Sequence, residues 1–237
     1  MVSGLTQLKI RNLFEARKYE EALAVYRKAT QKGADSRDRL SISRLCLKLG
    51  RWDEAEEELR KIDRNKLSSL EVLQARVNLI LAKWKKGELE DAIRRAESLF
   101  GEEKVTLTYA TLGYLYIERA FAKKDWKKTV SFNKEAMEYN GSNGEIQDNY
   151  GQALLESGDW EGALAVYEGM AKQKTPPSFG EWRYHYGQAL AKAGRLDEAL
   201  EQMRLALARG YSALSALDEA TVKAAIERLE AKKAAQG

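Results

Sequence analysis

The chain contains one cysteine and one histidine, Cys46 and His185. These two types of side chain can act together as a nucleophile and its general base. A structural zinc site needs a full set of Cys and His ligands, which this chain does not supply. The sequence also lacks a phosphate-binding loop and a glycine-rich dinucleotide motif. We therefore expect no metal and no other cofactor, and any catalysis would depend on whether the fold brings Cys46 and His185 together.

The composition excludes several classes of protein. The chain has 40 basic and 36 acidic residues, and its net charge of +4 is too balanced for a general affinity for nucleic acid or membranes. A single cysteine cannot form an intramolecular disulfide. The sequence contains no run of about 18 apolar residues, the length needed to cross a membrane. The N-terminus lacks the pattern of a signal peptide. We expect a cytoplasmic protein that binds no nucleic acid, although a natural N-terminal anchor could be missing from this sequence.

An internal repeat indicates how the chain positions its side chains. The stretch YGQALLESGDWEGAL at 150–164 returns as YGQALAKAGRLDEAL at 186–200, with eight of fifteen positions identical. Each copy contains a Gly, a bulky residue two positions later and an Ala five positions later, as in Gly158, Trp160 and Ala163. The position of that Ala recurs with a spacing of 33 to 37 residues, at 22, 55, 92, 129, 163 and 199.

Each copy predicts two helices joined by a tight turn. Apolar residues recur at helical spacing on both sides of Gly158, and this Gly ends the first helix and permits the turn. In two weaker copies Arg17 and Lys124 stand in its place. Acidic residues such as Asp197 and Glu198 begin the second helix, where the helix dipole favours negative charge.

The order of these residues resembles the tetratricopeptide repeat. The best copies are Tyr150, Gly151, Leu154, Gly158, Trp160, Ala163 and Tyr167, and then Tyr186, Gly187, Leu190, Gly194, Leu196, Ala199 and Met203. The resemblance implies an all-α solenoid, in which antiparallel helix pairs form a right-handed superhelix. It predicts one domain over 1–237, with six repeats and a capping helix at 4–33, 35–66, 67–102, 103–142, 143–177, 178–210 and 215–234.

The chain departs from the family pattern in several places. The proline that closes a repeat is present only at Pro176–Pro177, and Ser43 and Ile80 replace the glycine of the first helix in two repeats. Thr129 lies four residues later than the family spacing, which is about one helical turn. We therefore expect a long first helix in the fourth repeat, over roughly 103–123.

This arrangement argues against a Cys–His catalytic pair. Repeats in a solenoid contact mainly their neighbours, so Cys46 in the second repeat and His185 in the sixth should lie tens of ångströms apart. We expect Cys46 to be a buried apolar thiol, and His185 either to pack within its helix pair or to contact a partner. The prediction is that the chain is not an enzyme. Ser215 and Asp218 resemble a capping box at the start of the final helix.

In the resembled family the first helices line a concave groove that binds other proteins. The groove positions, carried over one by one, fall on Arg11, Phe14, Leu40, Arg44, Leu47, Val77, Leu81, Trp84, Tyr114, Glu118, Phe121, Asp148, Gln152, Tyr184 and Gln188. Apolar members would anchor a partner, or some of them could belong to the core between helices. Asn78 and Asn149 occupy the position where some family members bind an extended peptide backbone. The Lys and Asn that clamp a C-terminal carboxylate in one subtype are absent.

Two surfaces could therefore bind a partner. The leading prediction is a non-enzymatic scaffold that holds a peptide or helix of another protein in the groove, with Trp84 and Phe121 among the apolar anchors and Arg44 as the polar contact. The alternative is a docking edge for an acidic partner or an anionic membrane surface. This edge would consist of seven lysines around two successive turns, Lys83, Lys85, Lys86, Lys123, Lys124, Lys127 and Lys128.

Overall fold

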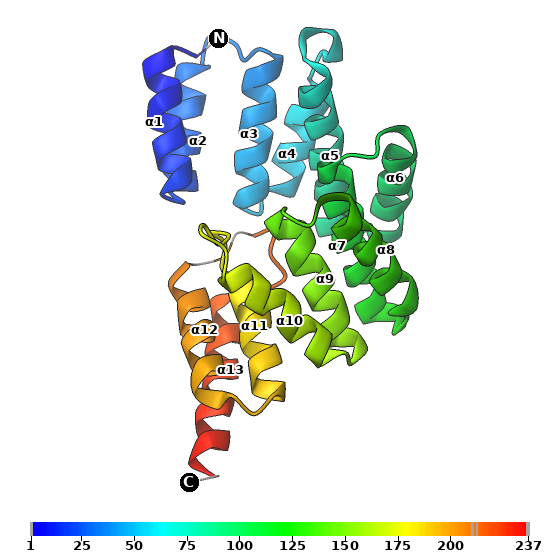
Figure 1. The fold of residues 1–237 in the computed structure, drawn as a ribbon. Coiled ribbons are helices and arrows are strands. Elements are labelled where there is room, and N and C mark those ends of the chain that lie inside the picture. The colour runs from blue at the N-terminus through cyan, green and yellow to red at the C-terminus, as the bar shows by residue number, and fades with distance from the viewer. Residues whose placement is uncertain (1, 210, 212, 236–237) are drawn as a thin grey trace. The chain divides into compact units, whose positions relative to one another are not determined.

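The computed structural model describes residues 2–209, 211 and 213–235, and these residues form α-helices and one short 3₁₀ helix without any β-strand (Figure 1). The fold is an all-α helical repeat. The helices are α1 (Gly4–Glu15), α2 (Tyr19–Ala29), α3 (Ser36–Lys48), α4 (Trp52–Arg60), η1 (Arg64–Lys66), α5 (Ser69–Lys85), α6 (Leu89–Glu102), α7 (Thr106–Lys123), α8 (Lys127–Asn140), α9 (Gly144–Ser157), α10 (Trp160–Ala171), α11 (Glu181–Lys192), α12 (Leu196–Arg209) and α13 (Glu219–Ala234).

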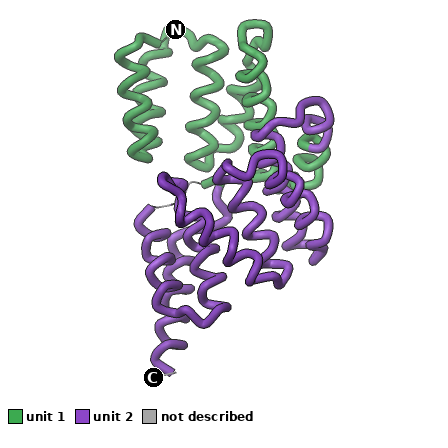
Figure 2. The backbone as a smooth tube through the Cα atoms, viewed as in Figure 1, with its two compact units in different colours: residues 1–96, 212–214 green, residues 97–211, 215–237 purple. Residues whose placement is uncertain are grey.

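The chain divides into two compact units, which Figure 2 shows in different colours. Unit 1 comprises residues 1–96 and 212–214, and unit 2 comprises residues 97–211 and 215–237. Two α-helices lie within each of the six predicted repeat ranges. The number of repeats and the single domain over 1–237 stay predictions.

The turn inside each predicted repeat has a left-handed residue, as the pattern requires. The six turn positions have φ values of 58° at Arg17, 74° at Gly50, 89° at Gly87, 56° at Lys124, 101° at Gly158 and 77° at Gly194. Glycine adopts this conformation readily because it has no Cβ atom, whereas a Cβ atom disfavours it. The equivalence of Arg17 and Lys124 with the glycines, predicted from the repeat alone, is therefore confirmed.

Small residues let the two helices of a repeat approach each other. A Cβ atom on Gly151 would lie 2.6 Å from Cζ of Tyr167, and one on Gly187 would lie 2.7 Å from Cγ of Met203. These distances are shorter than any normal carbon–carbon contact. The repeated Gly of the first helix is therefore required by packing against the second helix.

Two helix boundaries test the expectations from the sequence. Helix α7 has 18 residues, the most of any described helix, and ends at Lys123, so the expected lengthening of the fourth repeat is confirmed. Helix α13 begins at Glu219, four residues after the predicted start at 215. The reason is that the side chain of Asp218, not Ser215, caps the helix by accepting a hydrogen bond from the Thr221 backbone at 2.7 Å.

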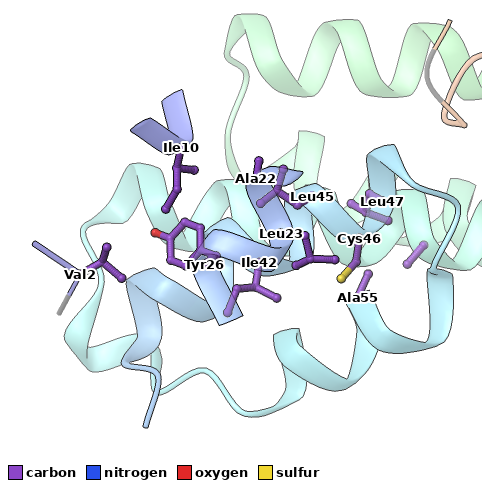
Figure 3. Packing of buried hydrophobic residues seen from close by; sticks show 11 residues of the cluster. Val2, Ile10, Ala22, Leu23, Tyr26, Ile42, Leu45, Cys46, Leu47 and Ala55 are labelled. Carbon is purple, nitrogen blue, oxygen red and sulfur yellow. The ribbon is translucent and has the colours of Figure 1, made fainter. Parts of the chain in front are cut away.

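Each unit has buried cores of its own. In unit 1 a cluster includes Leu23, Leu45 and Cys46 (Figure 3). Cys46 is 0% exposed, and burial raises the pKa of its thiol to about 11. Cys46 is thus a buried thiol, as expected, and poorly suited to act as a nucleophile. In unit 2 the largest fully buried side chains include Tyr167 and Trp182.

Candidate functional site

The candidate site lies on the first helices of three successive predicted repeats in unit 2. Helix α9 packs against both α7 and α11, and helical spacing gives each helix a row of polar and aromatic side chains on one face. We define the α7–α9–α11 face by Tyr114, Glu118, Phe121, Asp148, Gln152, Glu156, Glu181, Tyr184, His185 and Gln188.

A buried polar cluster that includes two residues of this face joins α9, α10 and α11. The Nδ1 atom of His185 lies 2.9 Å from Oδ1 of Asp148, and the hydroxyl of Tyr167 donates to the same oxygen at 3.1 Å. Burial alone would lower the pKa of His185, which is only 6% exposed. The nearby carboxylates, with Asp148 foremost, outweigh burial and raise that pKa above its usual value. The contact between Asp148 and His185 therefore links two neighbouring first helices.

Sequence reasoning did not predict this cluster, although a signal for it exists. Position 185 is equivalent to 149 in the preceding repeat, and position 184 is equivalent to 148. The pair Asp148–Asn149 thus becomes Tyr184–His185. When two adjacent inward positions differ from their equivalents in the preceding repeat, they indicate a side-chain contact that the other repeats do not share.

The middle of the face is strongly acidic. Burial and the carboxylates of Glu118, Glu181 and Asp148 place the pKa of the Tyr114 hydroxyl well above its usual value. The hydroxyl donates a hydrogen bond to Glu118. Glu156 adds a fourth carboxylate that acts on His185. Four carboxylates from three helices therefore lie within electrostatic range of Tyr114 or His185.

Two polar atoms on the face have no hydrogen-bond partner among the described residues. Oε2 of Glu181 and Oε1 of Gln188 are buried and accept no hydrogen bond. Gln152 is 8% exposed, but its amide atoms are not among the buried atoms that have no partner. Buried polar groups are usually paired, so these two unpaired acceptors are a feature that needs an explanation.

The face contains most of the predicted groove residues of unit 2. Tyr114, Glu118, Gln152 and Gln188 are among the residues that define it, and their role in a groove stays a prediction. Phe121 is 37% exposed and its ring packs edge-on against Trp126 at 5.1 Å between centroids.

Several predicted groove residues of unit 2 have partners within the chain. Asp148 belongs to the buried cluster described above, and Nε2 of Gln188 donates to the Tyr184 hydroxyl at 3.1 Å. Asn149 is buried, and its Nδ2 donates to the Ala110 carbonyl at 2.9 Å. Tyr184 is buried in a cluster with Val222 and Ala225 of α13. Their side chains are therefore engaged in packing and hydrogen bonding between helices.

In unit 1 four of the eight predicted groove residues belong to the core. Val77 and Leu47 are each 1% exposed, and Leu40 and Trp84 are also buried. This burial matches the alternative that these side chains pack between helices. Leu81 is partly buried.

The remaining members in unit 1 are closer to solvent. Arg11 is exposed, and its guanidinium lies 3.8 Å from Glu15. The guanidinium of Arg44 lies 4.7 Å from the centre of the half-buried Phe14 ring. Asn78, at a position predicted to bind a peptide backbone, is by contrast buried, and its Nδ2 donates to Ser43 at 3.4 Å.

Lysines of the predicted basic edge have acidic partners in unit 1. Lys83 pairs with Glu88 at 2.9 Å. Lys86 pairs with Asp53 and Glu56, both at 2.8 Å. The ammonium of Lys85 lies over the ring of Trp84. These contacts neutralise much of the positive charge that an acidic partner would need.

The lysines of unit 2 are mostly exposed. Lys128 lies 3.3 Å from Glu97, and its ammonium also lies over the Tyr116 ring. Lys123, Lys124 and Lys127 are exposed. Three of the seven lysines belong to unit 1 and four belong to unit 2. That all seven share one edge stays a prediction.

Comparison with known families identifies the fold. Two family models described as tetratricopeptide repeat match residues 13–76 and 150–213, which together make up more than half of the chain. The chain belongs to the tetratricopeptide repeat family. No curated protein matches it.

Solved structures of other tetratricopeptide repeat proteins have the same fold. The protein TTC0263 of Thermus thermophilus is 19% identical with a TM-score of 0.64, and the match covers 82% of this chain and 98% of that one. A tetratricopeptide repeat protein from Parabacteroides merdae ATCC 43184 is 13% identical with a TM-score of 0.71, covering 95% and 83%. A chain of the APC/C hetero-tetramer Cut9–Hcn1 is 15% identical with a TM-score of 0.65, covering 98% and 50%.

Membership of the family gives a general role. Tetratricopeptide repeat proteins generally act as non-enzymatic scaffolds, and this chain is a protein-interaction scaffold in that general sense. Among the described residues, none of the helices has the length and apolar character needed to span a membrane.

Proposed function

We propose that this tetratricopeptide repeat protein is a non-enzymatic scaffold that binds a peptide or helix of a partner protein on the α7–α9–α11 face of unit 2. The observation that carries the proposal is the pair of buried acceptor atoms without a donor on α11, Oε2 of Glu181 and Oε1 of Gln188. A partner segment on this face would supply their missing hydrogen bonds.

The exposure of neighbouring side chains supports the same surface. Phe121 on α7 is an exposed aromatic side chain of the same face, and aromatic side chains are frequent anchors of interfaces. By contrast, Leu47 and Trp84 of unit 1 are buried in packing. The groove residues of unit 1 that are exposed or half-buried are Arg11, Phe14, Arg44 and Leu81.

The proposal can be tested by selecting peptides from a displayed library of random 12-residue sequences against the full chain. We expect selected peptides to lose at least about tenfold in affinity, or about 1.4 kcal/mol, when Phe121→Ala and Gln152→Ala are combined. Fluorescence polarisation measures the affinity. Circular dichroism should show unchanged helix content, because neither residue fills a hydrophobic core.

A matched control removes an exposed apolar side chain elsewhere in unit 2. Leu205 on α12 is 39% exposed, and Leu205→Ala should leave the affinity unchanged. If the selected peptides bind the Phe121→Ala, Gln152→Ala protein as tightly as the original chain, the α7–α9–α11 face is not the binding surface.

A further inference from the structure

We infer that the turn between α7 and α8 docks on an anionic membrane surface, where Phe121 enters the lipid interface and the neighbouring lysines bind the headgroups. We define the α7–α8 patch as residues 121–128, which read FAKKDWKK and lie within unit 2. The inference goes beyond the proposed function, because it adds a second partner, a lipid surface, at the end of α7 and the start of α8.

The first argument is the exposure of Phe121. This side chain is 37% exposed, whereas Leu47, Trp84 and Leu155, which also stand three positions before the left-handed residue of their turns, are 1%, 8% and 8% exposed. The ring packs edge-on against Trp126, with 5.1 Å between the centroids, and every other residue of the patch is exposed. Aromatic rings are enriched at the boundary between lipid and water, so an exposed ring at this turn suits a membrane surface.

The second argument is the positive charge of the patch. It contains four lysines and one acidic residue, Asp125, and Lys128 lies 3.3 Å from Glu97 of α6. When both carboxylates are counted against the four lysines, a net charge of +2 remains. Glu118 and Arg119 precede the patch and balance each other. Basic side chains beside a membrane are attracted to its anionic lipids.

The third argument is the position of two of these lysines. Lys127 and Lys128 begin α8, whose first turn has no acidic residue. The second helices of four other predicted repeats, α2, α4, α6 and α12, each have two acidic residues in the first turn. The positive end of a helix dipole favours negative charge, so Lys127 and Lys128 weaken the start of α8. A negatively charged surface outside the chain would offset this cost.

The combination of ring and lysines favours a lipid surface over an acidic protein segment. A purely electrostatic partner would require the lysines alone, whereas the patch also presents an apolar ring to solvent. The long aliphatic stem of lysine lets its ammonium stay at the level of the headgroups while a neighbouring ring enters the apolar boundary. Apolar burial and attraction to anionic lipids then add together, as they do for segments that lie on a membrane.

The direct test measures sedimentation of the full chain with lipid vesicles. One set consists of phosphatidylcholine, and in the other a quarter of the lipid is the anionic phosphatidylglycerol. We expect saturable binding to the anionic vesicles, at least about tenfold weaker binding to the neutral ones, and a steep loss of binding when salt is added. Hydrogen exchange of the bound chain should slow at residues 121–128. Equal binding to the two sets of vesicles, or binding to neither, would overturn the inference.

Two double variants locate the charge. Lys124→Glu combined with Lys127→Glu should weaken binding to the anionic vesicles by at least about tenfold. The control combines Lys172→Glu with Lys174→Glu, which reverses the charge of two exposed lysines elsewhere in unit 2 and should leave binding unchanged. Circular dichroism should show that the first variant keeps its helix content, because a carboxylate at position 127 suits the start of α8. Equal binding of the two double variants would refute the role of the patch.

A further variant separates a lipid surface from other anions. Phe121→Ala keeps the charge and should weaken binding to the anionic vesicles by at least about threefold, while binding to poly-L-glutamate stays the same. If Phe121→Ala binds the vesicles as tightly as the original chain, the patch is a general surface for anions and the lipid surface is refuted.

The lysine variant also separates this inference from the proposed function. Lys124 and Lys127 are not part of the α7–α9–α11 face, so the variant with both lysines changed to Glu should bind the selected peptides as tightly as the original chain. If peptides bind but anionic vesicles do not, membrane docking is refuted and the scaffold stands. If vesicles bind but no peptide is selected, membrane docking stands and the peptide-binding role fails.

Discussion

At the scale of the residue, the contact between Asp148 and His185 interrupts the repeat. In the preceding repeat the position of His185 is Asn149, which bonds to the backbone of α7. His185 instead meets a side chain, Asp148 of α9, and the hydroxyl of Tyr167 completes the cluster. The bond of the Asn149 amide does not depend on charge. The bond of His185 to Asp148, one repeat later, depends on whether the histidine is protonated.

This contact predicts a pH dependence of stability. Because the folded pKa of His185 is raised, the protonated histidine stabilises the fold fully below its unfolded pKa of about 6.5. That contribution is lost as the pH rises through the folded pKa. We expect His185→Asn to lower the free energy of unfolding by about 3 kcal/mol at pH 6, as removal of one partner of a buried ion pair does, and by less at pH 9. Urea unfolding at a series of pH values measures the difference.

The control for this experiment is Tyr167→Phe, which removes the neutral donor to Asp148 and leaves His185 in place. It should destabilise the protein but retain the steeper loss of stability of the original chain between pH 6 and pH 9. A constant difference between the original chain and His185→Asn over this range would show that His185 is not protonated in the folded state.

At the scale of the element, the helix pairs depend on a left-handed residue at each turn. Gly158 and Gly194 meet this requirement without steric cost. Arg17 and Lys124 adopt the same conformation with a side chain. Their backbone is therefore strained by the turn, and the helices on either side maintain it.

This strain predicts opposite effects of substitution at equivalent positions. We expect Lys124→Gly to raise the free energy of unfolding by up to about 1 kcal/mol, and Gly158→Ala to lower it by about 1 kcal/mol. No atom lies within 4 Å of a Cβ added at Gly158, so the second effect is conformational and not a clash. Thermal and urea unfolding measure both changes.

A position with ordinary backbone provides the comparison. Lys127 begins α8 with an exposed side chain, and Lys127→Gly should lower stability because glycine disfavours a helix. If Lys124→Gly also lowers stability, the left-handed conformation at position 124 does not cost what we infer.

At the scale of the whole molecule, the period of the sequence predicts the helix pairs better than it predicts the site. Gly151 and Gly187 repeat because every helix pair needs the same close approach, so periodicity reveals them. Whether Trp84 or Leu47 is buried depends on side chains of neighbouring helices, which the period does not specify. The Asp148–His185 contact occurs at one place and therefore leaves no periodic signal.

Each unit has buried cores of its own. We therefore expect a cavity made in one core to destabilise the surrounding helices and not the whole chain. Leu45 is buried in the core of unit 1 and Leu190 in a core of unit 2. Each change of leucine to alanine should cost about 2–5 kcal/mol locally, and repeats in a solenoid transmit such a loss mainly to their neighbours. We expect Leu45→Ala to accelerate hydrogen exchange in α1–α5 and Leu190→Ala to accelerate it in α9–α12, as measured by mass spectrometry. Equal acceleration throughout the chain in both variants would mean that the cores open only together, as in a globular two-state domain.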